Sequence, residues 1–79
     1  MPAPLQGMLR QDMPYLELDG NTEAVVDGCL GVLEYTDTTI VLNGGACLLR
    51  FRGNALSLKA YSASQTEISG EFSAIEFVR

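Results

Sequence analysis

The segment VVDGCLGVLEY, residues 25–35, gathers the side chains best suited to chemistry: a cysteine, two acids and a tyrosine. Read alone, Cys29 beside Asp27 and Glu34 could be a reactive thiol. The chain contains no histidine, which is the commonest general base and metal ligand. A serine or cysteine nucleophile activated by histidine therefore cannot be built.

Cys29 and Cys47 are the two cysteines of the chain, and they form no CxxC motif. Without histidine they make a poor zinc site, so we expect small core or partly buried residues and no metal or cofactor. Two cysteines could form one disulfide. The N-terminus shows no basic segment followed by an apolar one, so no secretory signal is expected. Reduced thiols in the cytosol are the favoured alternative.

Glu34 and Glu76 occupy matching places in two similar segments, and paired carboxylates can do acid–base chemistry when one is buried. Each glutamate lies between apolar residues of an expected strand, so its side chain should face water. Arg50 and Arg52 are expected on the same outward face, and cross-strand charge pairing is the better interpretation. We therefore expect no catalytic residue and a protein that is not an enzyme.

The glycine-rich segment Asn43-Gly44-Gly45 is not followed by a lysine or a helix signal. It is therefore read as a hairpin turn and not as a phosphate-binding loop. Directly after it, Leu48 should face outward beside Arg50 and Arg52, while Cys47, Leu49 and Phe51 face the other way. An apolar residue on an outer face could belong to an interaction face for a partner.

A chain of 79 residues forms one domain at most, and so small a domain gains stability from burying apolar surface in an oligomer. The net charge is −5, with only five lysines and arginines. This composition argues against binding of nucleic acid or of an anionic membrane surface. No apolar run approaches the ~20 residues that span a bilayer, so membrane insertion is not expected.

From Pro14 onward, alternating apolar and polar residues predict strands. Turn signals at Gly20-Asn21, Asn43-Gly44 and Gly53-Asn54 help to divide the chain into about six of them, with no helix. Short connections imply an antiparallel meander, which must curl into a β-roll, a sandwich or a partly open barrel. We expect a single β domain over residues 14–79, after a flexible or short-helical segment over residues 1–13.

Residues 67–77, EISGEFSAIEF, repeat the pattern of residues 25–35. The alternation fails in the middle of each segment, so a β-bulge or sharp bend is predicted at Gly31-Val32 and at Ser73-Ala74. The expected inward residues, buried together within each segment, are Leu30, Leu33 and Tyr35, and Phe72, Ile75 and Phe77.

A weaker similarity links LELDGNTEAV to LRFRGNALSL, each read as strand, Gly-Asn turn, strand. We therefore expect a pseudo-twofold axis relating two strand-turn-strand units. The residues expected to carry structural roles are Gly20, Asn21, Gly28, Gly31, Leu33, Glu34, Tyr35, Gly53, Gly70, Ile75, Glu76 and Phe77.

Over residues 14–78 the order of these elements resembles the YabP/YqfC family of sporulation proteins, and its YqfC-like members in particular. The matching pieces are Pro14 with the strand before Gly20-Asn21, Glu23, the run Gly31-Val32-Leu33-Glu34-Tyr35, Ile40 with Leu42-Asn43, Gly53 before Leu56 and Leu58, and Gly70 with Ile75-Glu76-Phe77. Cys29-Leu30 departs from the family pattern at one loop or surface position.

The resemblance implies a role in endospore formation in a Gram-positive bacterium, in assembly of the spore envelope or coat. It implies the cytoplasm of the mother cell as the location, and it offers no catalytic residues. The leading hypothesis is a non-enzymatic assembly protein that makes β contacts with itself, as a homo-oligomer, or with a membrane-associated partner. The alternative is a small ligand- or glycan-binding β module, which requires a concave pocket with convergent polar groups.

Overall fold

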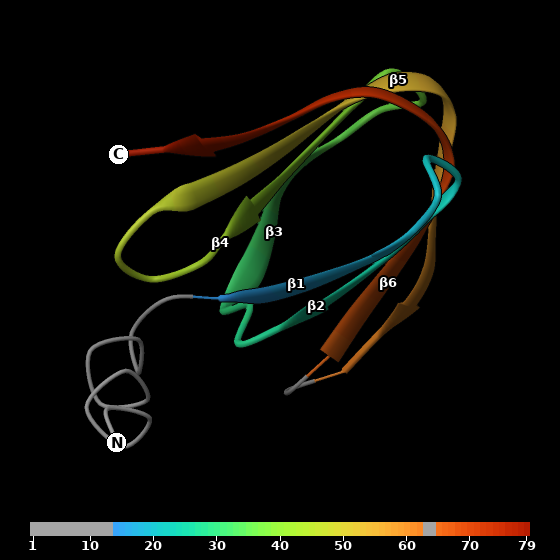
Figure 1. Ribbon diagram of the computed structural model, residues 1–79. Helices are drawn as coiled ribbons and strands as arrows, with labels where there is room; N and C mark the ends of the chain where they lie inside the picture. The colour runs from blue at the N-terminus through green and yellow to red at the C-terminus, as the bar shows by residue number, and fades with distance from the viewer. Residues whose placement is uncertain (1–13, 63–64) are drawn as a thin grey trace, which may run out of the picture.

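The computed structural model describes residues 14–62 and 65–79, which form six strands in one antiparallel sheet (Figure 1). The strands are β1 (Tyr15–Asp19), β2 (Glu23–Asp27), β3 (Gly31–Tyr35), β4 (Thr39–Asn43), β5 (Leu48–Tyr61) and β6 (Gln65–Val78). Their order in the sheet is β1-β2-β6-β5-β4-β3. The all-β prediction is confirmed, and the described residues contain no helix. The segment expected over residues 1–13 lies outside the described residues.

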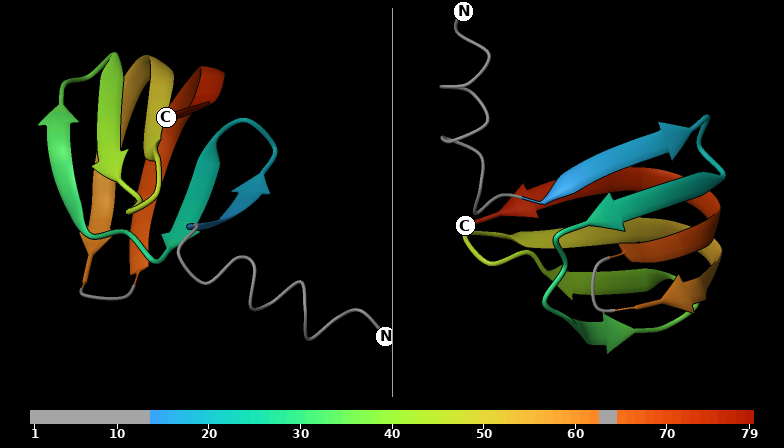
Figure 2. Two further views of the ribbon diagram at one scale, coloured as in Figure 1. Left: turned by 90° about the vertical axis from the view of Figure 1, so that its left-hand side faces the viewer. Right: turned by 90° about the horizontal axis from the view of Figure 1, so that it is seen from below.

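β5 and β6 are each 14 residues long and bend in the middle, so the sheet folds over on itself (Figures 1 and 2). The first layer consists of β1, β2, residues 65–69 of β6 and residues 57–61 of β5. The second layer consists of β3, β4, residues 48–52 of β5 and residues 73–78 of β6. The two ends of the sheet, β1 and β3, do not pair with each other, so the structure is a partly open roll.

Glycines make the bend possible where the two long strands cross between layers. A Cβ atom at Gly53 would overlap the carbonyl oxygen of Glu71 on the neighbouring strand. Gly70 has φ +139°, and a Cβ atom there would lie 2.8 Å from the carbonyl oxygen of Ala55. Ala55 itself has a positive φ of 55°. Close backbone approach and unusual dihedral angles therefore exclude larger side chains at these two glycines.

A pseudo-twofold relation appears in the strand pairing. The β1–β2 turn accepts hydrogen bonds from β6, at 3.0 Å from Gly70 N to Thr22 O and 2.8 Å from Phe72 N to Asn21 O. The β3–β4 turn accepts matching bonds from β5. These run from Gly53 N to Thr38 O at 3.1 Å and from Leu56 N to Asp37 O at 2.8 Å. The relation therefore exchanges the β1–β2 hairpin with the β3–β4 hairpin, and β6 with β5.

These equivalent units differ from the ones that the sequence repeats indicated. Residues 25–35 cover the end of β2, a connection and all of β3, whereas residues 67–77 lie within the single strand β6. The turn predicted at Gly53-Asn54 is wrong, because both residues lie inside β5. Pairing with β6 continues on both sides of the bend in β5, so the glycine bends the strand there and does not end it.

The core lies between the two layers. Its buried members are Ala24, Val26, Cys29, Ile40, Leu42, Leu49, Phe51, Leu56, Ile68 and Phe72. The alternation predicted for Cys47, Leu49 and Phe51 is confirmed, since all three are buried. The rings of Phe51 and Phe72 pack with centroids 5.6 Å apart. Thr66 is fully buried, and its Oγ1 has no hydrogen-bond partner among the described residues.

The two predicted bulges are confirmed to within one residue. The register of β3 with β4 skips Leu33, and the register of β6 with β5 skips Ser73. The burial predicted around them is wrong in four of six positions: Leu30, Leu33, Tyr35 and Phe77 are 68%, 58%, 50% and 50% exposed. Only Phe72 is buried, and Ile75 is partly buried. The exposed residues lie at or beside strands that end a layer, where no described strand covers them.

Candidate functional site

Two sides of the molecule leave strand edges unpaired. One side, called the groove side below, is formed by β1 and residues 73–78 of β6. Each of these segments pairs with one neighbour only within the described chain. The other side, called the tyrosine side below, is formed by β3 and residues 57–61 of β5. Each of these segments also pairs with one neighbour only within the described chain. Each side therefore presents one edge from each layer, and an unpaired edge is a template for pairing with another chain.

The exposed large hydrophobic side chains gather on these two sides. They are Tyr15, Leu18 and Phe77 on the groove side, and Leu33, Tyr35 and Tyr61 on the tyrosine side, with Leu30 just before β3. Monomeric proteins usually protect such edges with charges, prolines or covering loops. Apolar side chains concentrated beside open edges are typical of an interaction surface.

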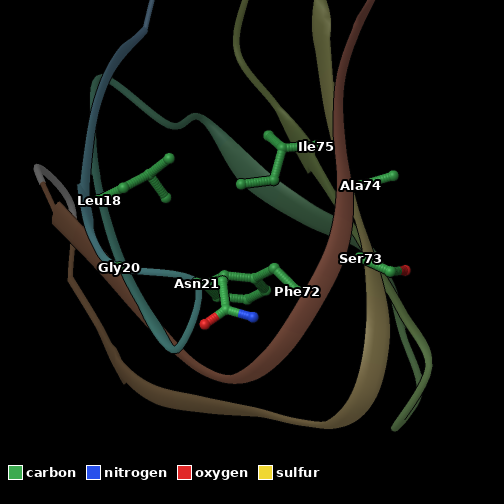
Figure 3. A pocket seen from close by; sticks show the side chains of 7 residues that line it. All are labelled: Leu18, Gly20, Asn21, Phe72, Ser73, Ala74 and Ile75. Atoms are coloured by element: carbon green, nitrogen blue, oxygen red, sulfur yellow. The ribbon is translucent and has the colours of Figure 1, made fainter.

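A groove of about 200 Å³ lies between β1 and the bend of β6. It is lined by Leu18, Gly20, Asn21, Phe72, Ser73, Ala74 and Ile75. Figure 3 shows Leu18 and Ile75 pointing toward each other with Phe72 at one end, while Ser73 and Ala74 point away. The Ser73 hydroxyl instead donates to the Arg52 carbonyl oxygen at 3.1 Å. This lining suits apolar side chains better than a polar ligand, which needs several convergent polar groups.

On the tyrosine side, the Tyr35 side chain spans the gap between the two layers, at the place that corresponds to the groove. The hydroxyl oxygen of Tyr35 on β3 accepts a hydrogen bond of 3.0 Å from the backbone N–H of Leu58 on β5. This bond links the two layers and occupies one donor of the open β5 edge. The two sides are therefore related in strand arrangement and different in side-chain shape.

The cross-strand pairing expected for the outward charges is confirmed for Arg50 and Glu76. Their Cα atoms are register partners, and Arg50 Nε lies 2.8 Å from Glu76 Oε1. The hydrogen bond and positive charge of Arg50 hold the pKa of Glu76 below its usual value, and the charge of Arg52 adds to this effect. Both side chains are about two-fifths exposed, at 41% and 42%, so water screens the pair.

Glu34 lies on β3, separated from Glu76 on β6 by β4 and β5. The two carboxylates therefore do not form an acid–base pair. The expected interaction face of Leu48, Arg50 and Arg52 lies on the outer face of the second layer, with Arg52 exposed and the other two partly buried. Its role in binding stays a prediction.

The glycines expected to have structural roles differ in their surroundings. Gly20 and Asn21 form the β1–β2 turn, with φ +60° at Gly20. Gly28 follows β2 with φ +87°. Gly31 begins β3 and needs no special freedom, because a Cβ atom there would meet nothing within 4 Å.

The two cysteines are free thiols, and both are buried. Cys29 joins the core, and its Sγ donates to the Gly31 carbonyl oxygen at 3.3 Å. In the part of the chain that the structure describes, no cluster of three potential metal ligands occurs. The same part contains no helix long and apolar enough to cross a membrane.

The comparison with protein families matches the YabP family over residues 11–79. The chain belongs to the YabP family. Membership agrees with the resemblance read from the sequence, and it suggests a sporulation-related protein. No curated protein and no solved structure shows significant similarity to the chain.

Sequence reasoning missed the groove and the two open sides of this YabP-family fold. Leu18 has the alternation of a core residue, and it shares a face with buried Ala24, its register partner. It is nevertheless 49% exposed, because the opposite layer ends before covering it. No local sequence signal reports this, since the strand order alone decides which strands end a layer.

Proposed function

We propose that this YabP-family protein is a non-enzymatic sporulation protein that acts in assembly of the endospore envelope or coat. It works through β-mediated protein–protein contacts in the mother-cell cytoplasm. Its partners are other protein subunits, including a membrane-associated sporulation protein. Family membership supports the process, and the open sides support the mode of action.

One observation carries the mode of action: the exposed large hydrophobic residues lie at strand edges that have no partner in the described chain. Adding a strand to such an edge supplies main-chain hydrogen bonds, and the apolar side chains beside it supply buried area and specificity. A domain of this size also gains stability from burying surface against partners.

The test is affinity capture of the tagged full chain from sporulating cells of its native host. Recovery of spore-envelope, coat or membrane proteins supports assembly. Leu33→Asp places a charge on an open edge, so it should reduce that recovery. Val41→Asp is the matched control, because Val41 is partly buried on the inner strand β4. Normal spores from a deletion strain, with no protein captured, would refute the proposal.

A further inference from the structure

The two open sides can complete each other. We propose that the chain assembles head to tail with further copies of itself, with β3 of one copy adding to residues 73–78 of β6 in the next. This inference deepens the proposed function, because it names the first partner as a second copy.

Strand direction permits this contact in both layers at once. Each layer contains four antiparallel strand segments, so the segments at its two ends run in opposite directions. In the second layer, β3 of one copy would therefore lie antiparallel to residues 73–78 of the next. In the first layer, residues 57–61 of the first copy would face β1 of the next in the same relation, with the N–H of Leu58 already bonded to the Tyr35 hydroxyl. A like-oriented copy continues both layers without breaking the antiparallel pattern.

The apolar side chains match in kind. On the groove side, Leu18, Ile75 and Phe77 share the faces of the buried residues Ala24, Phe51 and Leu49, their register partners. They are core-facing residues that no described strand covers. The tyrosine side of the neighbouring copy offers exposed Leu30, Leu33 and Tyr35 on or beside β3. Contact between the two sets would bury both.

The charges favour unlike sides. Glu34 is exposed on β3, and Arg52 is exposed one strand inward from the open edge of β6. Neither forms an ion pair within the described chain. Ala74, the register partner of Arg52, stands between Arg52 and that edge. Because Ala74 is small, the long Arg52 side chain can reach across it to a Glu34 on an added strand.

Pairing of like sides lacks this complementarity. Two tyrosine sides would bring two Glu34 carboxylates to one junction, and two groove sides would offer neither Arg52 a Glu34 partner. Like charges on facing strands destabilise the pair. Contact between different surfaces of identical subunits also propagates, and it gives a filament unless the rotation closes a ring.

The experiment is sedimentation velocity on the purified full chain over a concentration series. Wild type should form species larger than a dimer as concentration rises. Leu33→Asp on the tyrosine side and Leu18→Asp on the groove side should each weaken self-association about 100-fold, because a carboxylate is forced into an apolar contact. Phe77→Asp replaces L18D if that variant does not fold by circular dichroism, and Leu30→Asp likewise replaces L33D.

Mixing the two variants decides the geometry. L33D keeps an intact groove side and L18D keeps an intact tyrosine side, so an equimolar mixture should form a complex of two chains and stop there. A wild-type protein that stays monomeric, or that stops at a dimer, would overturn the proposal. Failure of the mixture to associate would also overturn it. Purified protein is used throughout, so a negative result leaves the capture of sporulation partners as a separate test.

Discussion

The hydroxyl of Tyr35 on β3 bonds the backbone N–H of Leu58 on β5, which lies 23 residues further along the chain and in the other layer. The bond is 3.0 Å long, and it closes part of an edge that would otherwise offer its donors to another chain. Tyr35 therefore has two roles on the tyrosine side: its hydroxyl forms a hydrogen bond between the two layers, and its ring contributes exposed apolar surface.

Tyr35→Phe should lower the free energy of unfolding by about 0.5–1 kcal/mol, because Leu58 N–H loses its protein acceptor at a site that water reaches. Urea denaturation measures the loss, and faster hydrogen exchange at the Leu58 amide locates it. Tyr61→Phe is the matched control, because Tyr61 is 51% exposed and its hydroxyl makes no hydrogen bond with the described residues. Equal stability of Y35F and wild type would contradict the prediction.

The bend glycines should tolerate substitution poorly. Gly53→Ala would force the new Cβ against the backbone of Glu71. We therefore expect the free energy of unfolding to fall by about 3 kcal/mol or more. Gly70→Ala should lower the free energy of unfolding by a similar amount. Its φ of +139° is strained for a residue with a side chain, and the new Cβ would lie too close to the Ala55 carbonyl oxygen.

Gly31→Ala is the control for both bend variants, since its Cβ would enter open space. Its stability should stay within about 0.5 kcal/mol of wild type. Thermal and urea unfolding of the three variants measure the difference. A bend variant as stable as G31A would show that the strands can bend without glycine.

Thr66 offers a stabilising change. Its buried hydroxyl has no hydrogen-bond partner in the described part of the chain, and an unsatisfied buried hydroxyl costs free energy. Thr66→Val keeps the shape and removes this cost, so the free energy of unfolding should rise by about 1 kcal/mol. Thr66→Ser keeps the hydroxyl and loses a methyl group, so it should destabilise by about 1 kcal/mol. A lower urea midpoint for T66V would be the opposite result.

The ion pair of Arg50 and Glu76 predicts a pH dependence. Since the pKa of Glu76 is lowered in the folded protein from the ordinary 4.5, its stabilising effect is fully present above pH 4.5. The effect is lost as pH falls through the lowered pKa. Arg50→Gln should therefore be less stable than wild type above that range, and the two should converge in stronger acid.

NMR titration of the Glu76 carboxyl carbon measures the shift directly. Its midpoint in Arg50→Gln should move up toward 4.5, the ordinary value. Added salt should shrink the difference between the two proteins, because the pair is partly exposed. An unchanged midpoint in R50Q would assign the lowered pKa to another cause.

Local sequence determined the elements whose signals are local. Alternation of apolar and polar residues specified the all-β class and the buried face of Cys47, Leu49 and Phe51. Gly20-Asn21 and Asn43-Gly44-Gly45 marked two turns, in which Gly20 and Gly45 have positive φ values of 60° and 89°, angles that glycine accepts without steric cost. The absence of histidine excluded a nucleophile activated by histidine.

The tertiary structure decided which strands bend, which end, and which are left uncovered. Gly53-Asn54 carries the same turn signal as Gly20-Asn21, yet it lies within β5, because β6 pairs with β5 on both sides of the bend. Leu18 and Phe77 have the alternation of core residues and are half exposed, because their strands end a layer. Such outcomes depend on pairing between segments far apart in the chain, and no local pattern contains that information.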